Sequence, residues 1–128
     1  MTTQPPPTAK TILTVDDSAS MRQLVSFTLR DAGFKVIEAV DGNDALARMN
    51  GVKIDLVITD LNMPNLNGIE LIRRIRTLPP HKYIPIVMLT TESHATQKAA
   101  GREAGASGWI VKPFQTSQLL AVVNKFLG

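Results

Sequence analysis

The strongest constraint on this chain is a regular alternation between short apolar, β-branched runs and longer segments with helical spacing. Thr11–Val15 is the first such run, and residues 18–32 then carry apolar side chains on one helical stripe, namely Met21, Leu24, Val25, Leu29 and Ala32. Further strands are predicted at 34–38, 54–59, 84–89 and 107–111, and further helices at 43–50, 68–77, 94–104 and 116–127. The pattern predicts five strand–helix pairs.

Strands that alternate with helices favour a parallel sheet with helices on both faces, because parallel strands need crossover connections. We therefore expect a doubly wound α/β fold. A five-stranded parallel sheet of this kind commonly has the flavodoxin-like order 2-1-3-4-5. Its ligands bind beyond the C-terminal ends of the first and third strands, where the strand order reverses.

The composition is that of one ordinary globular domain of 128 residues, with 44% apolar and 20% charged residues. Residues 1–9 include three consecutive prolines and are expected to form a disordered tail before a domain at 10–128. Cysteine is absent, which excludes disulfides, thiolate nucleophiles and cysteine-based zinc sites. No signal core or run long enough to span a bilayer is present, so we expect a cytoplasmic protein without a membrane partner.

A formal charge of +3 raises the question of nucleic acid binding. The basic residues are scattered, however, and their densest group is Arg73, Arg74 and Arg76 on a predicted helix. Without interleaved aromatic residues this group is interpreted as a solvated helix face. His81 and His94 lack metal-ligand spacing and are likewise expected on the surface. We expect no nucleic acid partner.

Acidic residues end two strands that are neighbours in the predicted order. Asp16 and Asp17 follow the first strand, and Asp60 follows the third. Each has a simpler reading, because Asp16 and Asp17 could cap the next helix and Asp60 could belong to a turn. Three carboxylates at one sheet edge would repel, however, and Mg²⁺ is the hard cation that such oxygen ligands favour.

Two further strand ends converge on the same edge. Thr90 and Thr91 follow the fourth strand, and Lys112 and Pro113 follow the fifth. Together they supply hydroxyl donors and a fixed cation opposite the carboxylates. A site that handles a phosphoryl group requires this combination.

Taken in their order along the chain, the segments that end the strands resemble the receiver domains of bacterial response regulators, and especially the chemotaxis type. The resemblance covers residues 10–128 and is carried by 13–18 (LTVDDS), 58–64 (ITDLNMP) with Gly68, 88–92 (MLTTE) and 105–114 (GASGWIVKPF). It implies that Asp60 accepts the phosphoryl group. It also implies that Asp17, Asp60 and the carbonyl of Asn62 bind Mg²⁺ directly while Asp16 acts through water.

The resemblance implies further roles around the acceptor. Lys112 would pair with the acyl phosphate, aimed by a cis bond to Pro113, and the Thr90 hydroxyl would move toward a phosphoryl oxygen. Trp109 stands where the family commonly has a tyrosine switch residue. Asn62 and Glu92 flank the site and match residues associated with a phosphoryl lifetime of seconds to minutes. Thr91 lies between Thr90 and Glu92 in the sequence. The weakly amphipathic helix at 94–104, the strand through Trp109 and the last helix would form the partner surface.

The implied partners are a sensor histidine kinase, a flagellar motor switch protein and an auxiliary phosphatase. The chain itself is expected to be a monomer and a phosphoryl-accepting switch rather than an enzyme in the usual sense. The absence of a segment after 114–128 favours a stand-alone chemotaxis regulator. A phosphorelay intermediate, a phosphate sink or the receiver of a larger regulator remains open. A metal-dependent phosphatase or nucleotide-binding enzyme is a remoter alternative, because no Walker A loop or glycine-rich dinucleotide fingerprint is present.

Overall fold

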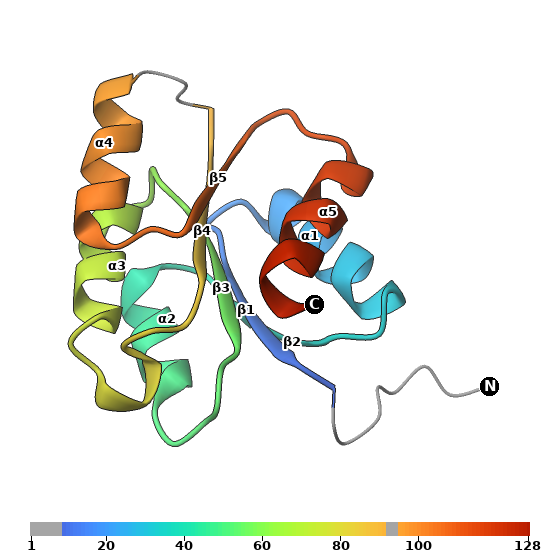
Figure 1. The fold of residues 1–128 in the computed structure, drawn as a ribbon, viewed down its shortest axis with the longest axis horizontal. Coiled ribbons are helices and arrows are strands. Elements are labelled where there is room, and N and C mark those ends of the chain that lie inside the picture. The colour runs from blue at the N-terminus through green and yellow to red at the C-terminus, as the bar shows by residue number, and fades with distance from the viewer. Residues whose placement is uncertain (1–8, 92–94) are drawn as a thin grey trace.

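Five parallel strands form the middle layer of the computed structural model, which describes residues 9–91 and 95–128 (Figure 1). The strands are β1 Thr11–Val15, β2 Lys35–Ala39, β3 Leu56–Asp60, β4 Ile86–Thr90 and β5 Gly108–Val111. Their order in the sheet is β2-β1-β3-β4-β5, and each neighbouring pair is parallel. The predicted order and strand direction are confirmed.

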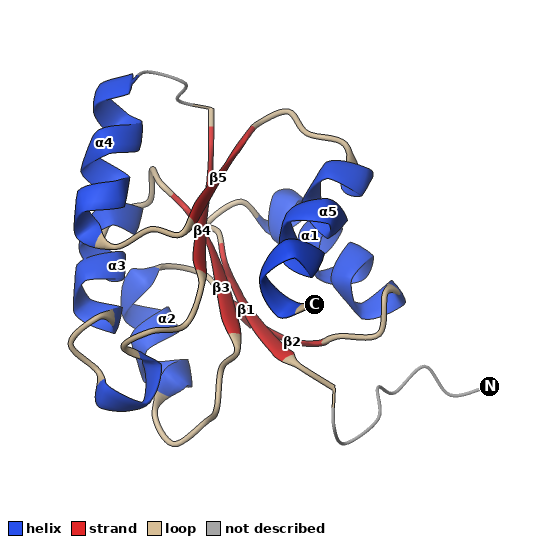
Figure 2. Cartoon of the chain, viewed as in Figure 1, coloured by secondary structure: helices blue, strands red, loops and turns tan. Residues whose placement is uncertain are grey.

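Helices cover both faces of the sheet, as expected for this topology (Figure 2). The helices are α1 Ala19–Asp31, α2 Gly42–Met49, α3 Gly68–Ile75, α4 Ala95–Ala104 and α5 Thr116–Leu127, with a short 3₁₀ helix, η1, at Pro79–His81. Figure 2 shows α2, α3 and α4 on one side of the sheet and α1 and α5 on the other. Of the disordered tail predicted at residues 1–9, residues 1–8 lie outside the described part.

Each strand contributes side chains to two separate hydrophobic cores. In β1, Leu13 and Val15 pack under α2 and α3, while Ile12 packs against α1 and α5. In β4, Met88 and Leu89 divide in the same way. Successive strand residues point to opposite faces, so a strand buried on both faces is apolar throughout. This explains why the sequence shows continuous apolar runs rather than alternating ones.

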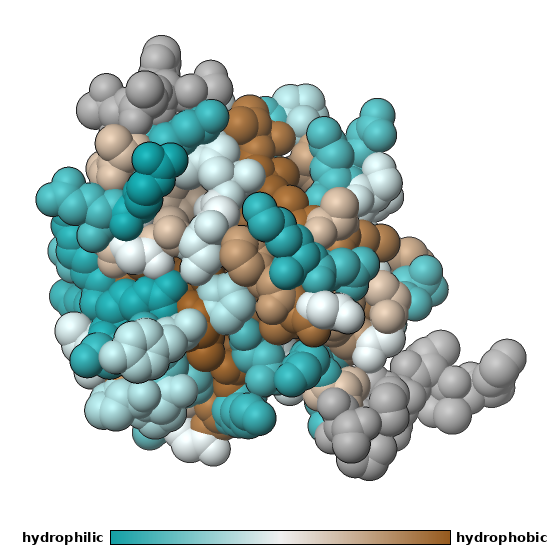
Figure 3. All heavy atoms as spheres, viewed as in Figure 1, coloured by the Kyte–Doolittle hydropathy of each residue, from teal (hydrophilic) through white to brown (hydrophobic). Residues whose placement is uncertain are grey.

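On the molecular surface, apolar and polar residues also occupy separate regions. Figure 3 shows apolar residues along the line between the two helical layers, with hydrophilic side chains over the helices beside it. Strand β5 is an edge strand, and its Val111 is 38% exposed. None of the described helices is both long enough and apolar enough to cross a bilayer.

The helical stripe predicted for 18–32 is wrong in part. Val25 and Leu29 are fully buried, but Leu24 is 43% exposed and Ala32 is also exposed. The buried arc of α1 instead includes Thr28, whose Oγ1 donates a hydrogen bond to the Leu24 carbonyl at 2.8 Å. Because this hydroxyl is satisfied within its own helix, it can be buried at little cost.

Of two basic residues expected on the surface, Arg76 is half-buried and His81 is buried. Arg76 ends α3 with its guanidinium donating to the carbonyls of Gly105 and Ile84 at 2.6 Å each, and burial lowers its pKa. His81 is 4% exposed, and its Nε2 lies 3.3 Å from the Ile54 nitrogen and 3.0 Å from the Val52 oxygen. Both side chains satisfy backbone groups of distant segments, so their burial depends on tertiary packing. His94, the other histidine, lies outside the described residues.

Candidate functional site

Two acidic strand ends lie side by side because of the register of the sheet. Val15 of β1 pairs with Thr59 of β3, so the next residues along, Asp16 and Asp60, are neighbours. Asp60 is itself the last residue of β3, one position later than predicted, because the ladder continues to its pair with Leu89. Parallel strands thus bring distant carboxylates to one edge.

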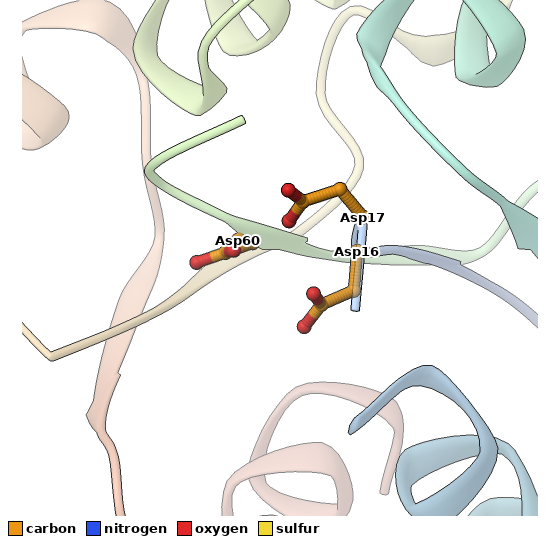
Figure 4. Close-up of side chains that lie close together, drawn as sticks. All are labelled: Asp16, Asp17 and Asp60. Carbon is orange, nitrogen blue, oxygen red and sulfur yellow. The ribbon is translucent and has the colours of Figure 1, made fainter. Parts of the chain in front are cut away.

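Asp16, Asp17 and Asp60 form a compact carboxylate cluster, shown in Figure 4. One oxygen from each lies within 4.8 Å of the others. Asp16 is 2% exposed and Asp60 is 8% exposed, whereas Asp17 is open to solvent. The three side chains leave the ends of β1 and β3, as the sequence predicted, and oxygen donors this close together suit a hard divalent cation such as Mg²⁺.

The helix-capping interpretation of Asp16 and Asp17 is wrong. The N-cap of α1 is Ser18, whose hydroxyl accepts a hydrogen bond from the Met21 nitrogen at 3.3 Å. Asp16 Oδ1 instead accepts from the Ser18 nitrogen at 2.9 Å, which fixes the carboxylate at the sheet edge. Capping is thus performed by the next serine, leaving both aspartates for the cluster.

Lys112 provides the cation opposite these carboxylates. Its Nζ lies 3.3 Å from Asp16 Oδ2 and 3.4 Å from Asp60 Oδ1, and its side chain is 14% exposed. The backbone nitrogen of Lys112 donates to the Thr90 carbonyl at 2.7 Å, beyond the end of β4. The Lys112–Pro113 bond is cis, as predicted. The lysine therefore bridges two carboxylates from two different strands.

The environment of Asp60 opposes its ionisation. Burial raises the pKa of the Asp60 carboxyl above its ordinary value, and the negative charge of Asp16 raises it further. The Lys112 ammonium lowers the pKa but does not cancel these two effects. Three carboxylates face a single ammonium here, and an added cation would relieve the repulsion between them.

The loop after β3 depends on Gly68. Its nitrogen donates to the Leu61 carbonyl at 2.9 Å, so the first residue of α3 lies directly over the end of the strand. A Cβ at this position would overlap the Asp60 carbonyl oxygen and lie 2.9 Å from Leu61 Cα. Both neighbours are backbone atoms, so glycine is required for this approach. Asn62 lies exposed in the same loop.

The remaining predicted residues lie on β4 and β5 or just beyond them. Thr90 is fully buried at the end of β4, paired in register with Val111, and Thr91 is exposed. Pro113 is exposed after the lysine. Glu92, the predicted tuning residue, lies outside the described residues.

Trp109 is half-buried on β5, directly opposite Met88 of β4. Its indole Nε1 is buried and has no hydrogen-bond partner in the described chain, and Lys98 Nζ lies 5.9 Å from its ring centroid. A Cβ on Gly101 of α4 would lie 2.7 Å from the end of Met88 and 3.5 Å from the Trp109 ring. Gly101 thus allows close packing of α4, a role that its low helix propensity alone did not indicate.

Sequence reasoning missed two arginines that tie loops to the scaffold. Arg22 donates from Nη1 to the Asp16 carbonyl at 2.7 Å, next to the cluster. Arg76 is the C-cap of α3 and follows the buried Ile72 by four residues, so it continues the buried side of that helix. The helical spacing could have indicated Arg76, whereas no local pattern marks the contact of Arg22.

Comparison with known proteins agrees with this geometry. Residues 12–124 match the family described as response regulator receiver domain. The chain belongs to this family. The receiver domain is 41% identical over 115 residues to the chemotaxis protein CheY of Pseudomonas aeruginosa, covering 89% of this chain and 93% of that protein. It is also 41% identical over 115 residues to chemotaxis protein CheY-3 of Vibrio cholerae, covering 89% and 88%.

Solved structures give the same assignment. The receiver domain superimposes on chemotaxis protein CheY4 of Vibrio cholerae with a TM-score of 0.90 and 43% identity, over 92% of this chain and 98% of that one. It also matches NtrX of Brucella abortus with a TM-score of 0.86 and 31% identity, but only 27% of that longer chain is covered. The protein is therefore a receiver domain of the CheY type.

Proposed function

We propose that this receiver domain is a phosphoryl-accepting switch in which Asp60 takes its phosphoryl group from a sensor histidine kinase. The observation that carries the proposal is the pairing of Lys112 with both Asp16 and Asp60 inside a cluster of three carboxylates. In a purely structural role this arrangement would be costly, because a single lysine cannot neutralise the whole cluster. A site that receives Mg²⁺ and a phosphoryl group explains the excess charge.

In the proposed transfer, an oxygen of the ionised Asp60 carboxylate attacks phosphorus in line with the kinase phosphohistidine. The new bond is O–P of an acyl phosphate, the P–N bond breaks, and its electron pair returns to the histidine ring. Mg²⁺, held by Asp17, Asp60 and the Asn62 carbonyl with Asp16 acting through water, would neutralise charge on the phosphoryl oxygens.

The other residues act around that centre. Lys112 is already 3.4 Å from Asp60 Oδ1, so its ammonium can pair with the phosphoryl oxygens that appear there. The Thr90 hydroxyl would turn toward the same oxygens, and Trp109 would change its packing in response. Thr91 and Pro113 would adjust the two loops, and Asn62 with Glu92 would admit the water that ends the signal within seconds to minutes.

For the output, we propose phospho-dependent binding to a flagellar motor switch protein through α4, β5 and α5, with a chemotaxis kinase upstream and an auxiliary phosphatase. The support is the sequence identity of 41–43% with the chemotaxis proteins CheY, CheY-3 and CheY4. The match to part of NtrX favours a second candidate, in which the same chemistry serves a larger regulator or a relay.

The test is phosphorylation by acetyl phosphate with Mg²⁺, read as incorporated label. We expect Asp60→Asn to abolish labelling and Asp17→Asn to raise the Mg²⁺ concentration needed. Asp31→Asn, at an exposed position at the end of α1, is the matched control and should label normally. Label that persists in Asp60→Asn would contradict the proposal and favour a metal-dependent phosphatase.

The output is tested separately by capture of purified motor switch protein on the phosphorylated and unphosphorylated domain. Phosphorylation-dependent capture would support a motor output. Equal capture in both states, with normal labelling of Asp60, would instead favour a sink, relay or larger-regulator role.

A further inference from the structure

A large hollow lies at the end of the sheet opposite the aspartates. It has a volume of about 760 Å³ and lies between the end of α2, the chain leading into β3, the end of α3 and η1. In Figure 1 these segments lie together at the lower left, whereas the carboxylate cluster is at the other end of the strands. A volume of this size is typical of small-molecule sites.

The lining of the hollow is mainly aliphatic. Its apolar lining residues are Leu46, Ala47, Met49, Val52, Leu78, Pro79 and Pro80. Its floor includes His81, whose Nε2 contacts backbone atoms of the loop before β3. The lining includes no phenylalanine, tyrosine or tryptophan for a ring to stack on. These surfaces favour an alkyl chain over a nucleotide or other stacked aromatic ligand.

The charged residues of the lining are all basic. Arg74 and Lys53 line the hollow, and neither aspartate nor glutamate does. Within the described chain the Arg74 guanidinium makes no hydrogen bond or ion pair, whereas Lys53 shares its charge with Asp55 at 3.9 Å. Arg74 is therefore the group free to bind an anion, and its fork geometry matches a carboxylate.

The helix ends that face the hollow do not cancel this charge. C-terminal carbonyls carry partial negative charge, which would oppose an anion. Here the Met49 carbonyl accepts from Val52 and the Ile75 carbonyl accepts from Leu78, at 3.2 and 3.0 Å. These hydrogen bonds weaken the negative end of each helix, while Arg74 and Lys53 supply the two full positive charges of the lining.

We infer that this hollow binds a medium-chain aliphatic carboxylate, with the alkyl chain between α2 and η1 and the carboxylate on Arg74. The site is separate from the phosphoryl-accepting cluster and does not depend on the function proposed for it. Binding would give the receiver domain an input from a small metabolite in addition to its kinase.

The probe is octanoate, titrated into the full chain while backbone amide NMR shifts are recorded. We expect saturable binding, with shift changes concentrated at residues 46–53 and 77–81. Length-matched octanol and octylamine should bind at least several-fold more weakly, because octanol is uncharged and octylamine is positively charged, so neither forms an ion pair with a guanidinium. Saturable binding should persist in Asp60→Asn, which leaves the hollow intact.

Two variants on neighbouring residues separate a specific site from general attraction. Arg74→Glu should weaken octanoate binding about fivefold, the upper end of what one exposed charge pair contributes. Arg73→Glu, also exposed on α3 but outside the lining, carries the same change in net charge and should bind normally. Equal weakening by both variants, octanol binding as tight as octanoate, or no saturation at millimolar octanoate would each overturn the inference.

Discussion

Removal of the Lys112 ammonium should destabilise the domain in the absence of metal. Lys112→Ala leaves Asp16 and Asp60, at 2% and 8% exposure, without the cation that now lies 3.3 and 3.4 Å away. Removing one partner of a buried ion pair typically costs about 3–5 kcal/mol. Since the lysine is 14% exposed and the cluster opens to water at Asp17, we expect about 2–3 kcal/mol, or a melting temperature lower by about 8–12 °C.

The stability lost in Lys112→Ala should depend on pH and on the carboxylates that Lys112 contacts. Burial already raises the pKa of Asp60, and loss of the lysine raises it further, so the protonated carboxyl is favoured in the folded state. A raised pKa gives stability at low pH that is lost as pH rises through the folded-state value. The destabilisation should therefore be larger near neutrality than at about pH 5.

The assay is urea or thermal unfolding of four proteins in a double-mutant cycle: wild type, Lys112→Ala, Asp60→Asn and the double variant. We expect Lys112→Ala to cost at least about 1 kcal/mol less in the Asp60→Asn background, and added Mg²⁺ to reduce the loss in the wild-type background. Lys53→Ala, at a lysine whose side chain is 87% exposed, is the control and should change stability by less than about 0.5 kcal/mol. An equal cost of Lys112→Ala in both backgrounds would refute the electrostatic reasoning.

Three further substitutions test the packing around the site. Gly68→Ala should lower stability by about 1–3 kcal/mol and slow labelling, since its Cβ would overlap the Asp60 carbonyl; unchanged unfolding and labelling would show that the loop can yield. His81→Ala should cost about 1–3 kcal/mol, measured by urea unfolding, because it removes the partner of either the Ile54 N–H or the Val52 carbonyl, and a neutral result would mean that water replaces the ring. Gly101→Ala should shift the fluorescence of Trp109, the only tryptophan, and an unchanged spectrum would argue against close packing of α4 on that ring.

The sequence determined the order of the elements and the location of the site. Apolar periodicity distinguishes strands from helices, and the alternation requires crossovers that run right-handed over a parallel sheet. All strands of such a sheet end at one edge. Residues that follow separate strands, such as Asp16, Asp60 and Lys112, were therefore predictable neighbours although they are far apart in the chain.

Which polar groups are buried, and which groups they hydrogen-bond to, depends on tertiary packing. Arg76 and His81 looked like surface residues, yet each contacts the backbone of a segment distant in sequence. Gly68 and Gly101 are needed where a backbone or helix approaches another element. These roles arise from contacts between elements, and periodicity along one element carries no information on the distance to the next.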